Sequence, residues 1–113
     1  MQHRILLAAC ALWGVLWNYG ALAQQSAPAG DPKAAHQKIA MCEGCHGIPG
    51  YRTAYPEVYA VPKLGGQQAA YLQRALQAYK SGERSHPSMR GIASGLSEQD
   101  MADLAAYYGG AAK

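Results

Sequence analysis

The sequence predicts an all-α fold with about three main helices and two long loops. Three stretches repeat apolar residues three or four positions apart, which is the period of a helix with one buried face. Glycine and proline are concentrated between these stretches, and no alternating run of five residues indicates a strand. A chain of 113 residues is at most one domain plus any segment that is removed.

A secretory signal peptide is predicted over residues 1–23. A short basic start leads into an apolar run, and Ala21-Leu22-Ala23 is a small-residue cleavage pattern. An uncleaved membrane anchor is the alternative, which the shortness of the run disfavours. Cys10 is interpreted as an ordinary leader residue, because the apolar run continues beyond it. Residues 24–31 are then a flexible lead-in, and residues 32–113 form the folded domain.

The charge of the remaining chain limits the partners that it can bind, and its size limits the core that it can form. Removing 23 of the 113 residues leaves 90, with nine basic and seven acidic side chains. So small and scattered a positive charge excludes a nucleic-acid partner. A domain of this size buries only about two thirds of its unfolded surface, so its own core is marginal. A large apolar cofactor would complete such a core.

The first helix is predicted to begin at Asp31-Pro32, where aspartate can cap the free amides and proline suits the first helical position. Gly47 is placed to end it. One apolar stripe runs along this helix and consists of Ala35, Ile39, Cys42 and His46.

The stripe ends in Cys42-Glu43-Gly44-Cys45-His46, the pattern of covalent c-type haem attachment. On one helical turn Cys42, Cys45 and His46 project from the same side. Two thiols can then join the haem vinyl groups while the imidazole reaches the iron, so one haem c is predicted as the cofactor. A redox-active dithiol, half a zinc site and a structural disulfide are the alternatives, but none of them requires the histidine.

Residues 47–66 are predicted to form a long loop, because glycines and prolines interrupt any regular element there. So long a loop in a small domain is reasonable only where it covers a ligand. The helical period returns from Gln67 and is expected to stop at Ser81-Gly82. Residues 82–95 are predicted to form the second loop.

The last helix is predicted to open at Ser97, with Asp100 three residues later in a variant of the capping box. Gly109-Gly110 is expected to stop it. The residues expected on its buried face are Met101, Leu104, Ala105 and Tyr108.

A haem iron takes two axial ligands, and His46 is predicted as the first. The candidates for the second are His36, Met41, His86, Met89 and Met101. His36 and Met41 lie in the same helix as His46 and cannot reach across the ring, and Met101 is expected in the core. His86 and Met89 remain, both in the second loop.

Several further sequence blocks follow the haem motif in a characteristic order along the chain. They are Pro62-Lys63-Leu64-Gly65-Gly66-Gln67, the segment from Tyr71 to Arg84, Met89, and the segment from Leu96 to Tyr108. With these blocks the chain resembles a small single-haem class I cytochrome c of the bacterial periplasmic kind. It is similar also to one half of the di-haem cytochromes c. The resemblance covers essentially residues 32–109 and implies a class I cytochrome c fold wrapped around a covalently bound haem.

The resemblance implies roles for individual residues. The first and last helices would cross, and Ile39 would pack on the face of the last helix. The Pro62 carbonyl would accept a hydrogen bond from Nδ1 of His46, and Leu64 would lie against the haem. On the same basis Met89 is favoured over His86, so that His46 and Met89 would be the iron ligands.

These features predict a periplasmic one-electron carrier whose iron cycles between Fe(II) and Fe(III). Redox partner proteins would dock at the exposed haem edge, with no small-molecule substrate, and the mature protein would not span the membrane. It would therefore not itself be an enzyme. One alternative is an electron-relay subunit of a periplasmic dehydrogenase or oxidase, and a second is an open-iron haem enzyme or gas sensor. A thiol–disulfide module would need a βαβ pattern, which the sequence lacks.

Overall fold

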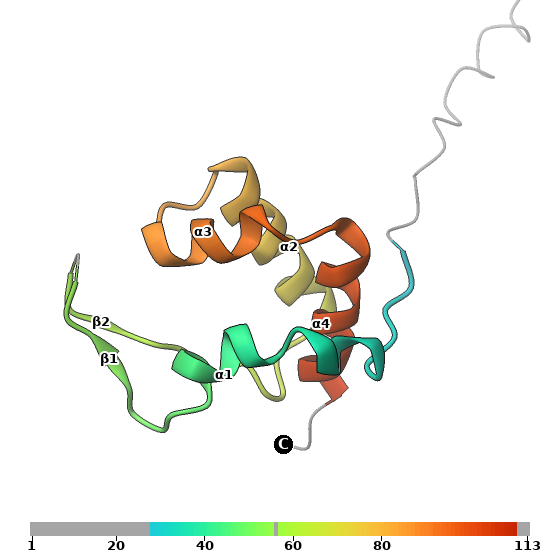
Figure 1. Cartoon of the computed structure of the whole chain (residues 1–113), viewed down its shortest axis with the longest axis horizontal. Coiled ribbons are helices and arrows are strands. Elements are labelled where there is room, and N and C mark those ends of the chain that lie inside the picture. Colours follow the sequence, from blue (N-terminus) through green and yellow to red (C-terminus); the bar gives the residue numbers. More distant parts are fainter. Residues whose placement is uncertain (1–27, 56, 111–113) are drawn as a thin grey trace, which may run out of the picture.

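The computed structural model describes residues 28–55 and 57–110, which form a mostly helical domain (Figure 1). The predicted signal peptide and Cys10 lie outside these residues. In chain order the elements are the 3-10 helix η1 (Ala34–Gln37), α1 (Ala40–His46), β1 (Arg52–Thr53), β2 (Tyr59–Ala60), α2 (Ala69–Ser81), α3 (Pro87–Ser94) and α4 (Glu98–Gly110). The predicted all-α class is confirmed, because the sheet within the described residues consists of two two-residue strands.

The predicted first helix is wrong in one respect, because it is broken into η1 and α1. The amide of Lys38 donates to the carbonyl of Ala35 at 2.8 Å, which is the shorter 3-10 spacing. Ala35 is buried against the core, and Lys38 reaches Asp100 of α4 with its Nζ 3.3 Å from Oδ1. The break in the helix therefore coincides with the contacts that Ala35 and Lys38 make with the rest of the domain. The spacing of apolar residues in the sequence does not reveal these contacts. The predicted end at Gly47 is confirmed.

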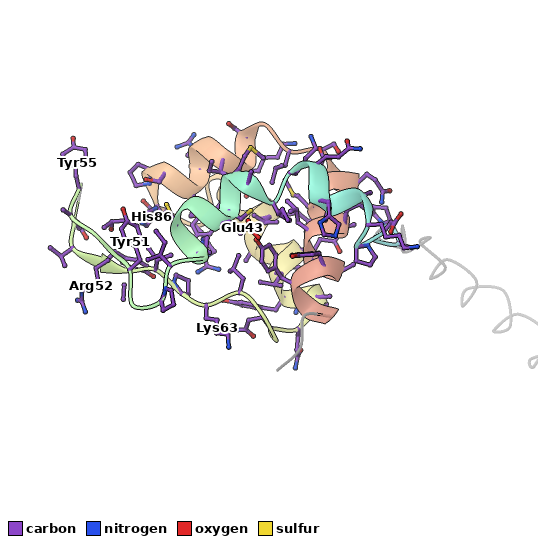
Figure 2. The ribbon with its side chains drawn as sticks, turned by 60° about the horizontal axis from the view of Figure 1, so that its bottom comes forward. Glu43, Tyr51, Arg52, Tyr55, Lys63 and His86 are labelled. Atoms are coloured by element: carbon purple, nitrogen blue, oxygen red, sulfur yellow. The ribbon has the colours of Figure 1, made fainter. Side chains whose placement is uncertain are left out.

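The predicted loop over residues 47–66 contains a short antiparallel hairpin. Arg52 pairs with Ala60 and Thr53 pairs with Tyr59. Strands of two residues are too short to show an alternating pattern, which explains why the sequence did not reveal them. In Figure 1 the hairpin projects away from the helices, and Figure 2 shows Tyr55 at its tip.

The predicted loop over residues 82–95 is wrong, because α3 occupies most of it. Pro87 takes the first helical position, and Nδ1 of the preceding His86 accepts a hydrogen bond from the amide of Met89 at 3.4 Å. Met89 therefore lies on a helix. Before it, α2 ends as predicted, with Gly82 in the left-handed conformation (φ 88°) that favours glycine.

The last helix begins and ends as predicted. Asp100 Oδ2 accepts hydrogen bonds from the amide and the hydroxyl of Ser97 at 2.9 and 2.8 Å. The expected stop at Gly109-Gly110 is confirmed, since α4 ends at Gly110. Gly109 also allows α4 to pack closely on the start of α2, because a Cβ built on it would lie only 2.9 Å from Cβ of Ala69.

The core lies where η1 and α4 meet. Its buried members are Ala35, Leu96, Met101 and Leu104, and the side chains packed against them are Ile39, Cys42, Leu76, Tyr107 and Tyr108. Met101 is completely buried, which confirms the core position expected for it. The packing of Ile39 against this cluster agrees with the crossing that the resemblance implied.

The segment before η1 closes over α4. The amide of Asp31 donates to the buried carboxylate of Asp103 at 2.7 Å, and Gln99 donates to the carbonyl of Ala29 at 2.9 Å. A Cβ on Gly30 would lie 2.0 Å from the carbonyl oxygen of Ala102, so only glycine fits there. Residues 29–31 were expected to be part of a flexible lead-in, and they instead contact α4. Among the described helices, none is both long and apolar enough to cross a bilayer.

Candidate haem-binding site

The six residues singled out by the sequence line one cavity of about 310 Å³. They are Cys42, Cys45, His46, Pro62, Leu64 and Met89. They come from α1, from the segment between the hairpin and α2, and from α3. In Figure 1, α1 lies below and α3 above, so the attachment motif and Met89 come from well-separated elements.

The α1 side of the cavity holds the attachment motif on a single helical segment. Cys42 is half-buried and Cys45 is exposed. Burial is the main cause and raises the pKa of the Cys42 thiol; the neighbouring Tyr108 hydroxyl acts in the opposite direction, and the nearby charge of Glu43 adds a smaller increase. A redox-active dithiol needs a thiol whose pKa is lowered, so the environment of Cys42 disfavours that alternative.

The imidazole of His46 is oriented by the backbone. Nδ1 lies 2.7 Å from the carbonyl oxygen of Pro62, and only a protonated Nδ1 can donate to a carbonyl. That tautomer leaves Nε2 as the nitrogen with a free lone pair. A histidine that binds a metal commonly donates its other ring N–H in this way, which fixes the orientation of the ring.

The opposite wall combines α3 with the face of α2. Met89 and Ile92 lie one helical turn apart on α3, and both line the cavity. His86 lines it too, but its Nδ1 already accepts from the amide of Met89, and its ring makes an edge contact with Tyr59 at 5.2 Å. His86 and Met89, the two candidates for the second axial ligand, therefore line the same wall of the cavity. One ring nitrogen of His86 is already used to cap α3.

The lining as a whole fits a haem. Its walls are mainly aliphatic and aromatic, and large side chains that face it, Met41, Tyr59 and Tyr71, are 45%, 48% and 44% exposed. The hydroxyl of Tyr108 is buried at the cavity near the Cys42 thiol, and no described residue lies at good hydrogen-bonding geometry to it. Two thiols and an oriented imidazole beside one apolar space fit the covalent attachment of a haem, and the thioether of Met89 belongs to a residue that lines the same space.

Some lining residues were not predicted as site residues. Ile92 and Ser88 belong to α3, which the sequence pattern did not reveal, and Arg84 was named only as the end of a segment that carries the resemblance. The spacing of Met89 and Ile92 at i and i+3 was the available signal for a helix at this point. For Arg84 no local signal exists, because the fold alone brings it to the cavity.

Comparisons with known proteins agree with this geometry. A family model described as "Cytochrome c" matches residues 33–108. Cytochrome c-554(548) from Halomonas halodenitrificans is 43% identical over 83 residues, covering 71% of this chain and 95% of the relative. Cytochrome c4 from Pseudomonas aeruginosa is 42% identical over 80 residues, covering 71% of this chain but only 38% of that protein.

A solved structure of a cytochrome c is similar to the chain as well. Reduced recombinant cytochrome c4 from Pseudomonas stutzeri superposes with a TM-score of 0.54 at 32% identity, covering 77% of this chain and 53% of the other. The chain therefore spans nearly the whole of the Halomonas relative, about two fifths of the P. aeruginosa protein and about half of the c4 structure.

Proposed function

The chain belongs to the cytochrome c family, and on that premise we propose that it is a periplasmic one-electron carrier whose iron is ligated by His46 and Met89. As a member of this family it carries haem c and transfers electrons. The observation that carries the proposal is that two thiols, an oriented imidazole and the Met89 thioether line one apolar cavity.

Each residue has a defined task in this proposal. Cys42 and Cys45 hold the haem by thioether bonds, and Nε2 of His46 binds the iron while Pro62 fixes the ring. Leu64 supplies apolar contact with the haem and excludes water from it. When bound, the haem supplies the reversible Fe(II)/Fe(III) couple.

Met89 is preferred to His86 as the distal ligand. A thioether favours the ferrous state relative to a second imidazole and raises the reduction potential, which suits reversible electron transfer. The hydrogen bond from the Met89 amide to His86 ties that imidazole to the backbone of α3, so the side chain of Met89 is the freer of the two.

A relay subunit is the second candidate, and one relative favours it. The "Thiosulfate dehydrogenase electron acceptor" from Stutzerimonas stutzeri is 37% identical over 65 residues, covering 58% of this chain and 29% of that protein. Both candidates use the same electron-transfer centre, and any substrate chemistry would reside in the partner. Periplasmic location rests on the signal peptide predicted from the sequence. Gel filtration of the native protein distinguishes a free carrier from a subunit of a larger complex.

Optical spectra of the Met89→Ala variant test the ligation. We expect it to keep covalent haem, to lose the sulfur-to-iron charge-transfer band, to bind carbon monoxide and to have a lower reduction potential. Met101→Leu is the matched control, because Met101 is buried in the core and does not line the cavity, and its spectrum should equal that of the wild type.

Two outcomes would contradict the proposal. An unchanged spectrum in Met89→Ala would identify Met89 as a bystander, and His86→Ala would then be the variant that loses a ligand. Ready binding of carbon monoxide by the wild-type protein would mean an open iron and would favour a haem enzyme or gas sensor.

A further inference from the structure

The segment around the β1–β2 hairpin exposes more apolar surface than the haem-binding cavity explains. Among the described residues, the exposed large apolar side chains are Met41, Ile48, Tyr51, Tyr55, Val58, Tyr59 and Tyr71. Met41, Tyr59 and Tyr71 line the cavity, where they would contact the haem. The other four do not line it, and all of them belong to the hairpin and the residues that flank it, 48–55 and 57–61, which we call the arm. A cluster of exposed apolar side chains on one segment marks a contact surface.

The register of the hairpin gives the arm an inner and an outer face. Thr53 pairs with Tyr59, and both line the cavity, so this pair belongs to the inner face. Arg52 pairs with Ala60, one residue along each strand, and therefore belongs to the outer face. Val58 directly precedes Tyr59 and falls on the outer face as well. The face that points away from the cavity is thus apolar apart from one charge, whereas the solvated face of a hairpin is ordinarily polar.

Contacts with the rest of the domain hold the base of the arm. The amide of Val61 donates to the carbonyl of Tyr51 at 3.0 Å, which extends the pairing of the two strands. The ring of Tyr59 makes its edge contact with His86, the residue that caps α3. A surface whose backbone is already held loses little conformational entropy when a partner binds to it.

The exposed part of the arm is large enough to contribute to a stable protein interface. Tyr55 lies at the end of the hairpin, clear of the helices, and is 86% exposed (Figure 2). Val58 is 68% exposed. A buried tyrosine hides about 150–250 Å², so Tyr51 and Tyr55 together offer on the order of 200 Å². With Ile48 and Val58 they supply a large part of the roughly 800 Å² that each partner buries in a stable interface.

The charges of the arm favour a second copy of this chain as its occupant. Arg52 and Glu57 are the charged residues of the arm, and both are exposed. Neither takes part in an ion pair with another described residue. Their charges cancel, so the arm attracts neither a strongly acidic nor a strongly basic partner. A surface with one charge of each sign is complementary to itself when a two-fold axis brings Arg52 of one copy opposite Glu57 of the other.

We infer that two copies of the chain associate through the outer faces of their arms. The contact is isologous, so Val58 and Tyr55 of each copy are buried by the same surface of the other, and the pair between Arg52 and Glu57 forms twice. Because the inner face of each arm lines its own cavity, the two arms are the layers that separate the two cavities. This arrangement suits electron exchange between the copies. That consequence rests on the proposed function, whereas the association itself does not.

Sedimentation equilibrium of the holoprotein over a range of concentrations tests the inference. We expect the wild type to change from the mass of one chain to that of two as its concentration rises. Arg52→Glu and Glu57→Arg should each weaken the association by about tenfold or more, because two like-charge contacts replace two ion pairs. An equimolar mixture of these two variants should associate as tightly as the wild type, because opposite charges then meet at both contacts.

Arg74→Glu is the matched control, because it reverses the same charge at an exposed position of α2 outside the arm. Its association should equal that of the wild type. Val58→Asp places a charge within the apolar contact and should keep the protein as a single chain at every concentration. The absorption spectra of all these variants should match that of the wild type, since none of the changed residues lines the cavity. Matching spectra separate a loss of association from a loss of haem or of folding.

Three outcomes bear on the inference from the other side. A single-chain mass for the wild type at up to about 1 mM protein would overturn it, and sedimentation of the wild type with phosphatidylcholine vesicles would then assign the arm to a lipid surface. A two-chain mass that Val58→Asp and the charge variants leave unchanged would also overturn it, because the contact would lie elsewhere. Carbon monoxide binding by the wild type would refute ligation by Met89 and leave the sedimentation results intact, so the two failures are distinguishable.

Discussion

Asp100 stabilises the start of α4 through both of its carboxylate oxygens. Oδ2 accepts two hydrogen bonds from Ser97, and the hydroxyl of Ser97 in turn accepts from the amide of Asp100 at 3.1 Å. Oδ1 lies 3.3 Å from Nζ of Lys38. The hydrogen bond from the Ser97 backbone is the main reason that the pKa of Asp100 lies below its ordinary value of 3.8. One side chain thus completes the capping box that the sequence predicted.

Asp100→Asn should make the free energy of unfolding lower by about 1 kcal/mol at neutral pH, since a charged cap accepts hydrogen bonds better than an amide. The pKa is lower in the folded state than in the unfolded chain. The stabilisation is therefore complete above 3.8 and is lost as the pH falls through the folded pKa. Denaturant unfolding of the two proteins should show curves that converge in acid.

The Lys38→Met variant removes the ion pair with Asp100 and keeps the capping hydrogen bonds between Ser97 and Asp100, so it separates the two contributions to stability. An exposed ion pair contributes little, so this variant should lie within about 0.5 kcal/mol of the wild type. If the free energy of unfolding of Asp100→Asn fell with decreasing pH as steeply as that of the wild type, the Asp100 carboxylate would not be the cause of the loss of stability in acid.

At the scale of elements, α2 and α4 pack closely at a glycine. A Cβ on Gly109 would lie 2.9 Å from Cβ and 3.1 Å from the backbone of Ala69, whereas a Cβ on the neighbouring Gly110 would meet nothing within 4 Å. The amide of Gly66 donates to the carbonyl of Tyr108 at 3.0 Å, which ties the segment before α2 to the same end of α4. The two glycines that appear to be stop signals in the sequence therefore differ in what they do.

Gly109→Ala should destabilise the holoprotein by about 1–3 kcal/mol, because the added methyl group forces the two helices apart. Gly110→Ala is the matched control and should leave stability unchanged or raise it by up to about 1 kcal/mol, through helix propensity alone. Thermal unfolding of both variants is the measurement. Equal melting temperatures would mean that the contact between α2 and α4 adapts without strain.

Elements with several turns of apolar repeat were predictable, and shorter ones were not. The sequence located α2 and α4 to within a few residues, because Leu72 and Leu104 belong to long stripes. It missed α3, which has only eight residues and contains Gly91, and it missed the two-residue strands. In the same way the attachment motif is visible in the sequence, while the approach of Arg84 to the cavity depends on contacts between distant elements.

At the scale of the whole molecule, the protein divides its apolar side chains between a small core and the cavity. Eight apolar residues are buried among those described, and four of them are alanines. Larger side chains such as Leu64, Leu76 and Ile92 line the cavity. Haem in contact with these side chains would add apolar burial that the core itself does not provide, so we expect folding and haem binding to be coupled.

Cys42→Ala/Cys45→Ala should prevent covalent attachment and remove most of the cooperative unfolding transition seen by circular dichroism. Because His46 is retained, adding free haem should restore part of the helical signal, which would show that the missing haem contacts cause the loss. A variant that unfolds cooperatively without any haem would demonstrate a self-sufficient core and would contradict this coupling.

The contact between residues 29–31 and α4 has a consequence for preparing the protein. A recombinant chain that starts at residue 32 would contain every residue of the cavity, yet Asp103 would keep only the hydrogen bond from Gln99 at 2.8 Å. Because Gly30 fits closely over Ala102, a purification tag has to join the chain upstream of this segment. The beginning of the folded domain is therefore defined by the docking of Ala29 and Asp31, a few residues before its first helical turn.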